Sequence, residues 1–181
     1  MTHLSHEYLS LIDLAYDSDQ NRLFEMKTIE LFTEECDFNG LHLGGSRKPD
    51  GVIYTTELSQ NFGVIVDTKA YSDGYNLPIS QADEMERYVR ENQTRNINVN
   101  QNQWWQNFGN DIQNYYFMFV SGHFIGNFTS QLDRINRNTG VNGTAIAITN
   151  LLLCANAIKS GTLTHQEIND SLFNNDEYHY N

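Results

Sequence analysis

The feature that most constrains the fold is a run of apolar and β-branched residues that ends abruptly in charged side chains. Residues 62–69 read Phe-Gly-Val-Ile-Val-Asp-Thr-Lys. Such a run is typical of a strand that is covered on both faces. Residues 51–56 have a similar composition, and a polar turn separates the two runs, so we expect a β-hairpin. A chain that contains such a hairpin must supply further layers to cover the sheet.

Apolar residues recur at helical spacing on either side of this hairpin. A loop is predicted around glycines 40, 44 and 45, and Ser80 and Thr149 are candidate N-caps. Helices are predicted over residues 3–16, 20–36, 81–92, 127–138 and 149–159, with a short one at 104–105 and a last one from Thr162 or Thr164 to about 174. Further strands are predicted at 115–121 and 143–148. Strands interleave with helices from residue 51 onward, which predicts a layered α/β fold.

Length and charge narrow the function classes. A chain of 181 residues fits one domain. Its 11 basic and 23 acidic residues give a net charge of −12, which excludes DNA binding through a polybasic arm. A nuclease stays possible, because carboxylates can meet a phosphate through a cation. No apolar run is long enough for a membrane span, and the first ten residues do not resemble a secretory signal, so we expect a cytoplasmic protein with no membrane partner.

The residues that carry chemistry stand at the ends of the two predicted strands. Side chains at i and i+2 of a strand share a face, so Asp67 and Lys69 project together. In the hairpin, Asp50 at one end of the neighbouring strand can approach Asp67. Two converging carboxylates suit Mg²⁺, which prefers oxygen ligands and keeps several waters. Lys69 could orient a water, stabilise developing phosphorane charge or help to remove a proton.

An ordinary structural interpretation competes with this hypothesis. Pro49-Asp50-Gly51 is also a common turn sequence, and a lysine two residues after an aspartate is often a solvated pair. On these residues alone the structural interpretation is the commoner one. Burying charged side chains at the end of an apolar run costs free energy unless they are used or paired. This cost favours the hypothesis that Asp67 and Lys69 carry out chemistry.

Several longer segments resemble a known family. They are LGGSRKPDG at 43–51, VIVDTKAYS at 64–72, NLPISQADEMERYV at 76–89, NQTRN at 92–96, WW at 104–105 and FVSGHFIGN at 119–127. The sequences of these segments, and the order in which they occur, resemble those of the cleavage domains of FokI-like type IIS restriction endonucleases. The resemblance implies a restriction-endonuclease-like PD-(D/E)xK core, in which a mixed central β-sheet is flanked by α-helices.

The resemblance also implies an activity and a site. The family hydrolyses double-stranded DNA with little sequence preference and leaves 5′-phosphate and 3′-hydroxyl ends. Asp50 and Asp67 match its metal-binding acids, Lys69 matches its catalytic lysine, and the Thr68 carbonyl is a further metal ligand in many members. The implied cofactor is Mg²⁺, with Mn²⁺ as a substitute.

Further expectations concern the protein's partners. Arg47 and Lys48 are the expected phosphate contacts, against the alternative of a solvated basic loop. A separate domain reads the DNA target in this family, and no such domain is found here, so residues 1–181 are interpreted as a single nuclease domain of the bacterial cytoplasm. Glu25 on the second predicted helix is a weaker candidate for an acid beside the metal.

The resemblance places a transient homodimer on the helix 81–92. Asp83 and Arg87 match residues that exchange salt bridges across a two-fold axis, as isologous symmetry allows. The alternative is an i, i+4 pair within one helix. Arg90 lies on the same face, where the family pattern has an acidic residue, so the interface charge differs in this chain.

Two other functions remain open at this point. A non-catalytic acidic module, for dimerisation or DNA mimicry, would share the fold, need no metal and tolerate loss of Asp67. A nuclease of the same fold could instead hydrolyse RNA. The joint presence of Asp50, Asp67 and Lys69 argues against an inactive relative.

Overall fold

The computed structural model describes all residues 1–181 and centres on a six-stranded sheet. Its strands lie in chain order, the first three pairing antiparallel and the last four parallel, so the sheet is mixed as expected. The strands are β1 (Asn39–His42), β2 (Gly51–Tyr54), β3 (Asn61–Lys69), β4 (Ile112–Ser121), β5 (Gly143–Ala147) and β6 (Asp176–Tyr178).

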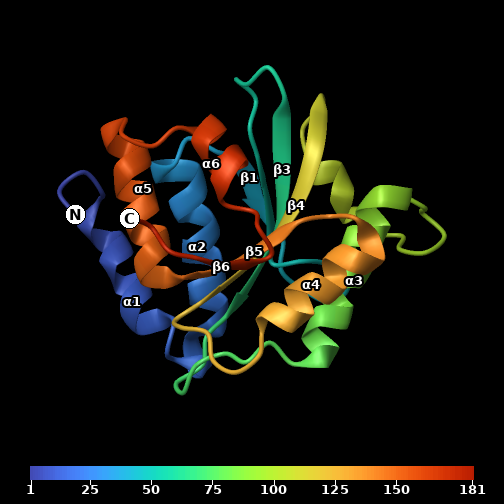
Figure 1. Cartoon of the computed structure of the whole chain (residues 1–181), viewed down its shortest axis with the longest axis horizontal. Helices are drawn as coiled ribbons and strands as arrows, with labels where there is room; N and C mark the ends of the chain where they lie inside the picture. The colour runs from blue at the N-terminus through green and yellow to red at the C-terminus, as the bar shows by residue number, and fades with distance from the viewer.

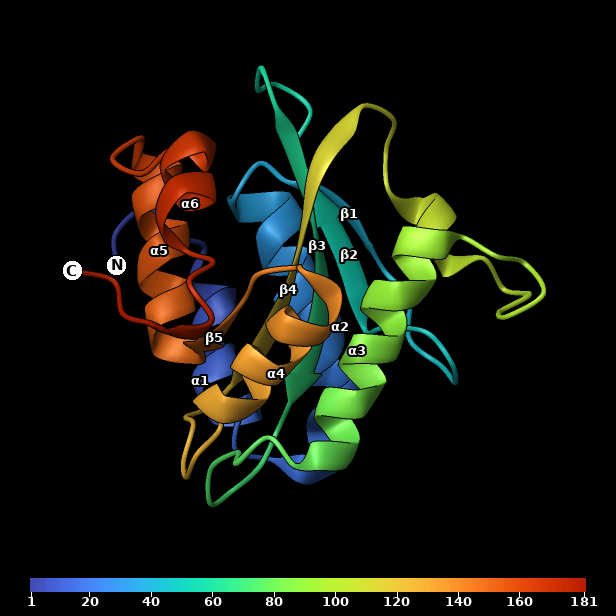
Figure 2. The ribbon, with the colours of Figure 1, turned by 45° about the vertical axis from the view of Figure 1, so that its right-hand side comes forward.

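Helices cover both faces of this sheet (Figures 1 and 2). One layer holds α1, α2, α5 and α6, and the other holds α3 and α4, which lie side by side. The helices are α1 (Leu11–Leu14), α2 (Asn21–Glu35), α3 (Ile79–Thr94), α4 (Thr129–Thr139), α5 (Ile148–Ser160) and α6 (His165–Ser171), with 3₁₀ turns at His6–Ser10, Ser18–Gln20 and Trp104–Asn107. None of the helices has the length and apolar character needed to cross a membrane.

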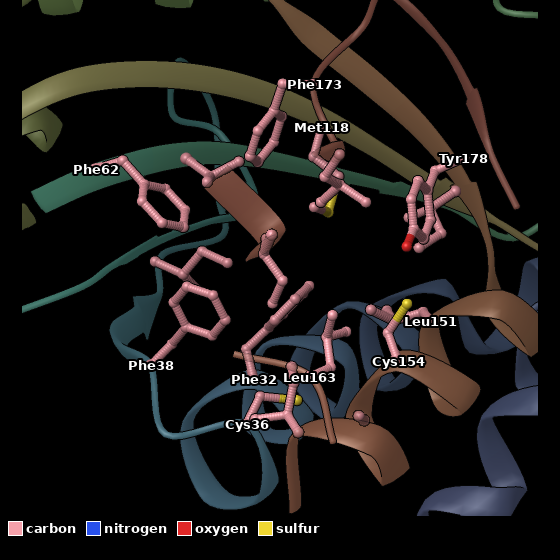
Figure 3. Close-up of a pocket in the computed structure, with 17 residues that line it drawn as sticks. Phe32, Cys36, Phe38, Phe62, Met118, Leu151, Cys154, Leu163, Phe173 and Tyr178 are labelled. Atoms are coloured by element: carbon pink, nitrogen blue, oxygen red, sulfur yellow. The ribbon is translucent and has the colours of Figure 1, made fainter. Parts of the chain in front are cut away.

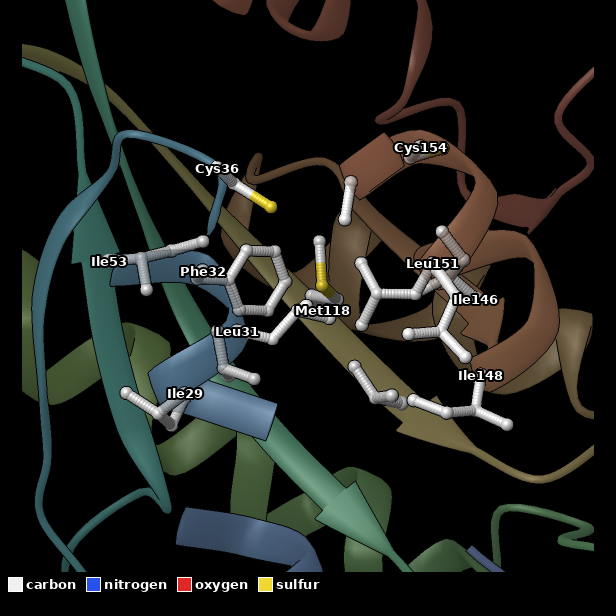
Figure 4. Close-up of a cluster of buried hydrophobic side chains, with 14 of the residues drawn as sticks. Ile29, Leu31, Phe32, Cys36, Ile53, Met118, Ile146, Ile148, Leu151 and Cys154 are labelled. Carbon is white, nitrogen blue, oxygen red and sulfur yellow. The ribbon is translucent and has the colours of Figure 1, made fainter. Parts of the chain in front are cut away.

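The predicted hairpin is confirmed by β2 and β3, and β3 is buried on both faces. Val64 and Val66 belong to the apolar cluster beneath α2 and α5, part of which is drawn in Figure 4. Ile65, between them, belongs to the second cluster, beneath α3 and α4. This alternation fixes which way the residues at the end of β3 face, because the next odd positions, Asp67 and Lys69, follow Ile65.

The two edge strands of the sheet, β1 and β6, were not predicted from the local sequence pattern. The segment with Gly40 was expected to be a loop but forms β1 against β2, and β6 lies beyond the last helix. A Cβ at Gly40 would lie 2.4 Å from the Val52 carbonyl, so the glycine permits close pairing of these strands. The first predicted helix is a 3₁₀ turn followed by a single helical turn, α1.

Helix caps were predicted with mixed success. Thr164 caps α6 in a capping box with Glu167, as one of the two expected choices. Ser80 and Thr149 are not caps, because α3 begins at Ile79 and α5 at Ile148, so each of these residues lies inside its helix. At α3 the chain turns at Pro78, whose carbonyl accepts the first helical hydrogen bonds.

Candidate active site

Asp50 lies immediately before β2 and is fastened to the neighbouring strand. Its Oδ2 accepts hydrogen bonds from the Thr68 backbone nitrogen at 2.7 Å and from the Thr68 hydroxyl at 3.1 Å. Thr68 stands between Asp67 and Lys69, so these bonds bring Asp50 to the other two residues. The convergence expected from the hairpin is therefore present, and Thr68 has a role in it that strand periodicity alone did not indicate.

Asp67 and Lys69 form an ion pair on the face of β3 that Ile65 also occupies. Lys69 Nζ is 2.7 Å from Asp67 Oδ2, and the two side chains are 18% and 7% exposed. The hydroxyl of Ser121, directly across on β4, donates a 2.6 Å hydrogen bond to the Lys69 carbonyl. The end of β3 is therefore held from both neighbouring strands.

The electrostatics of the three residues are coupled. Burial raises the pKa of Asp50 to about 6, although Lys69 and the Thr68 hydrogen bonds oppose the shift. Burial, and then the charge of Asp50, raises the pKa of Asp67 to about 7. Burial would lower the pKa of Lys69, but the charges of Asp67 and Asp50 outweigh it and the net shift is upward. The single ammonium of Lys69 does not offset the cost of ionising two buried carboxyls, so the site favours additional positive charge.

The donor set fits a hard divalent cation. Oδ2 of Asp67 is buried, and the Lys69 ammonium lies 2.7 Å from it. A bound cation would add positive charge beside the two carboxyls and would favour ionisation of both. No group of three or more His, Cys, Asp and Glu side chains is assembled for metal binding, so the protein ligands would be two carboxylates with backbone oxygen and water.

A hollow of about 190 Å³ opens beside this site. Asp50, Thr68 and Lys69 line one side, and α2 contributes Glu25. Glu25 is 2.8 Å from His42 Nε2 on β1, and its charge adds to the shift of the Asp50 pKa. The structure thus brings Glu25 to the site, together with a histidine partner that sequence patterns did not single out.

A second, smaller pocket is apolar and belongs to the core and not to this site. Figure 3 shows it between α2, α5 and the sheet, with Cys36 and Cys154 on its wall. Its volume is about 20 Å³ and all 17 lining residues are hydrophobic. A space of that size can hold about one water and offers it no polar partner, so the pocket is a packing feature.

Arg47 and Lys48 lie in the loop that leads to Asp50. The Arg47 guanidinium donates a 2.9 Å hydrogen bond to the Val99 carbonyl, so it is tied to the segment after α3. Arg47 has a φ of 61°, in the left-handed region that non-glycine residues rarely adopt. The Lys48 carbonyl accepts a hydrogen bond from the Tyr88 hydroxyl of α3. A role for either basic side chain in DNA contact stays a prediction.

The three residues of the expected dimer face lie exposed along α3. Asp83 is paired with Arg134 of α4 at 2.8 Å, and Arg87 lies 3.6 Å from Glu91. Arg90 lies 3.4 Å from Glu86. The i, i+4 pair between Asp83 and Arg87 is absent, so the simplest intrachain alternative is not formed. Pairing between two copies is not tested by this arrangement.

A mixed sheet with an aspartate just before one strand, and an aspartate and a lysine at the end of the next, has the architecture of restriction endonucleases. The family model described as "FokI, cleavage domain" matches residues 1–179. The chain belongs to the FokI cleavage-domain family.

Relatives and solved structures agree with this assignment. The chain is 51% identical over 180 residues to the type II restriction enzyme FokI of Planomicrobium okeanokoites, covering 99% of this chain and 31% of that protein. It is 36% identical over 176 residues to the type II restriction enzyme StsI of Streptococcus sanguinis, covering 95% and 28%.

The fold similarity is equally close. The structure of FokI matches with a TM-score of 0.96 and 50% identity, over 99% of this chain and 32% of that one. The structure of FokI bound to DNA matches with a TM-score of 0.95 and 51% identity, over 98% and 31%. The chain therefore spans about a third of the length of these relatives.

Proposed function

We propose that this chain is a metal-dependent endonuclease that hydrolyses double-stranded DNA with little sequence preference. The observation that supports this most is the meeting of Asp50 with Asp67 and Lys69 through Thr68, in a chain of this family. The structure of FokI bound to DNA, which is 51% identical in sequence to this chain, supports DNA as the substrate. The bacterial relatives further support a role in the bacterial cytoplasm.

In the proposed reaction, water attacks a phosphodiester, the bond from phosphorus to the 3′ oxygen breaks, and 5′-phosphate and 3′-hydroxyl ends result. Asp50, Asp67 and the Thr68 carbonyl would hold Mg²⁺ or Mn²⁺, which supplies Lewis acidity and lowers the pKa of bound water. The Lys69 ammonium pairs with Asp67 at 2.7 Å at the end of β3. We therefore assign Lys69 to stabilising negative charge on the phosphate oxygens.

We further propose that two copies cooperate transiently through α3 for a double-strand break. Under a two-fold axis, Asp83 of one copy can meet Arg87 of the other, and the reverse. Both side chains are about half exposed, and Ile97 and Val99 add apolar surface just beyond the helix. In this structure Asp83 is paired with Arg134, and Arg87 with Glu91. These ion pairs within one copy would compete with association of two copies, which suits a weak interface.

Target choice would come from another part of the protein or from a fused DNA-binding module. This chain covers only about a third of its curated relatives, which leaves room in them for a recognition region. The net charge of −12 is consistent with weak intrinsic affinity for DNA.

The test is cleavage of supercoiled plasmid, with Mg²⁺ or with chelator, beside an equal concentration of structured RNA. We expect nicked and linear DNA only with metal, intact RNA, and a rate of linearisation that rises more than linearly with protein. RNA breakdown at an equal rate would instead support the ribonuclease alternative. An intact plasmid, even after fusion to a DNA-binding module, would contradict the nuclease assignment and support the acidic binding module.

A further inference from the structure

The loop that carries Asp50 is held by hydrogen bonds to its backbone carbonyls from α3 and the segment after it. The Tyr88 hydroxyl donates to the Lys48 carbonyl at 2.8 Å. Its other neighbour, Glu84 Oε1, is more distant at 3.3 Å, so the single hydroxyl hydrogen is directed to Lys48. The side-chain amides of Asn100 and Asn102 both donate to the Arg47 carbonyl, at 2.9 and 3.1 Å.

These bonds act where the backbone needs support. Arg47 adopts a left-handed φ of 61°, which is strained for a residue with a Cβ. Such a conformation persists only when its surroundings determine it. The amides of Asn100 and Asn102 support the Arg47 carbonyl, three residues before Asp50. The Tyr88 hydroxyl supports the Lys48 carbonyl, two residues before Asp50. The direction in which the chain enters β2 therefore depends on them.

Asn100 is itself fixed by a buried carboxylate. Its amide nitrogen also donates to Glu91 Oε2 at 2.8 Å, and the indole nitrogen of Trp104 donates to the same oxygen at 2.8 Å. Glu91 is 3% exposed and Asn100 is 2% exposed. Burying a carboxylate is costly unless it is paired and hydrogen-bonded. Here Glu91 uses its hydrogen bonds to turn both amide hydrogens of Asn100 toward their acceptors.

We propose that Tyr88, Asn100 and Glu91 are positioning residues for the metal ligand Asp50. They hold the Arg47 and Lys48 carbonyls, and this fixes the approach of the Asp50 carboxylate to Thr68 and Asp67. The inference rests on the proposed metal-dependent function. It adds to that function a set of residues on α3 and the following segment that never touch substrate but set the affinity of the metal site.

Tyr88→Phe tests this proposal with a change of one oxygen atom. Tyr116→Phe is the matched control, because the Tyr116 hydroxyl also donates a 2.8 Å hydrogen bond, to Asn169, and its neighbours lie in the opposite layer. Mn²⁺ binding is measured without DNA from the loss of the electron paramagnetic resonance signal of free Mn²⁺. We expect Tyr88→Phe to weaken Mn²⁺ binding about tenfold, and Tyr116→Phe to bind as the wild type does.

A kinetic measurement separates positioning from general damage. Plasmid cleavage by Tyr88→Phe should need about tenfold more Mg²⁺ for half its maximal rate, and saturating Mg²⁺ should restore that rate to within about twofold of wild type. Equal Mn²⁺ affinity in wild type and Tyr88→Phe would overturn the positioning role while leaving the proposed function intact. A wild-type protein that neither binds Mn²⁺ nor cuts DNA would overturn both.

Discussion

The carboxylate of Asp50 and both donors of Thr68 form one hydrogen-bonded unit across β2 and β3, with bonds of 2.7 and 3.1 Å. This contact joins residues eighteen positions apart and places Asp50 beside the strand end that bears Asp67 and Lys69. Three consecutive residues of β3 thus have distinct tasks, since Thr68 holds Asp50 while Asp67 and Lys69 point to the other face.

Removing the Thr68 hydroxyl should therefore weaken the site without dismantling it. Thr68→Val leaves the backbone bond in place, and we expect a loss of about 1 kcal/mol in stability. We also expect a higher pKa for Asp50, because hydrogen bonds from Thr68 lower it. Carbon-13 NMR of the Asp50 carboxyl measures the pKa. Thr68→Ser should keep the wild-type value, and an unchanged pKa in Thr68→Val would contradict the assigned contact.

The acidic pair should make the metal-free protein less stable as pH rises. Aspartate in an unfolded chain has a pKa of about 3.9, whereas the folded pKa values here are about 6 and 7. Between about pH 4 and pH 7 the unfolded state binds fewer protons than the folded state, so the contribution to stability falls. Below pH 4 both states are protonated and the penalty is absent.

Asp67→Asn should remove much of this pH dependence. With chelator present, we expect the variant to be more stable than wild type at pH 8 by about 1–2 kcal/mol, with a smaller gain at pH 5. Urea unfolding at the two pH values measures the difference. A variant that is less stable than wild type at pH 8 would show that the Lys69 ion pair outweighs the cost of burying the charge.

Gly51 permits α2 to lie close to the loop that bears Asp50. A Cβ at this position would lie 2.5 Å from Ile29 Cδ1, in a buried site. Gly51→Ala should therefore cost about 1–3 kcal/mol through overpacking. Chemical denaturation measures the cost, and Ile29→Val, which removes that methyl group, should recover part of it in the double variant. Additive losses in the double variant would argue against a direct clash.

The α3 face offers a charge-exchange test of association. Asp83→Arg and Arg87→Asp each place like charges opposite one another across a two-fold axis, so each variant alone should linearise plasmid at least tenfold more slowly. An equimolar mixture should recover activity, because both reciprocal pairs are complementary in a mixed dimer. The control is circular dichroism of each variant, since Arg87→Asp also places a carboxylate beside buried Glu91. A mixture no faster than its components would contradict this interface.

The central hairpin and the shared face of Asp67 and Lys69 could be predicted because they depend on strand periodicity, a local property. The edge strands could not. β1 is half exposed and contains Gly40, and β6 has only three residues, so neither has a buried apolar run. Both form because a neighbouring strand offers unpaired backbone groups, which no local pattern records.

The site was predictable in its charged residues but not in what holds them. Asp50, Asp67 and Lys69 could be proposed from strand ends and from family resemblance. The bonds from Tyr88 and Asn100 to the preceding loop join residues 40 and 53 positions apart. Such contacts depend on how α3 packs against the sheet, and an isolated tyrosine or asparagine gives no sign of them.

The most direct test of the central claim compares wild type with Asp67→Asn in cleavage of a labelled DNA duplex across a Mg²⁺ titration, each fused to the same DNA-binding module. The substitution keeps the size of the side chain and, on the account above, does not destabilise the fold. We predict metal-dependent cutting by wild type and at least a thousandfold slower cutting by Asp67→Asn at every Mg²⁺ concentration. Cleavage by the variant within tenfold of wild type would contradict the assignment of Asp67, and with it the proposed metal site.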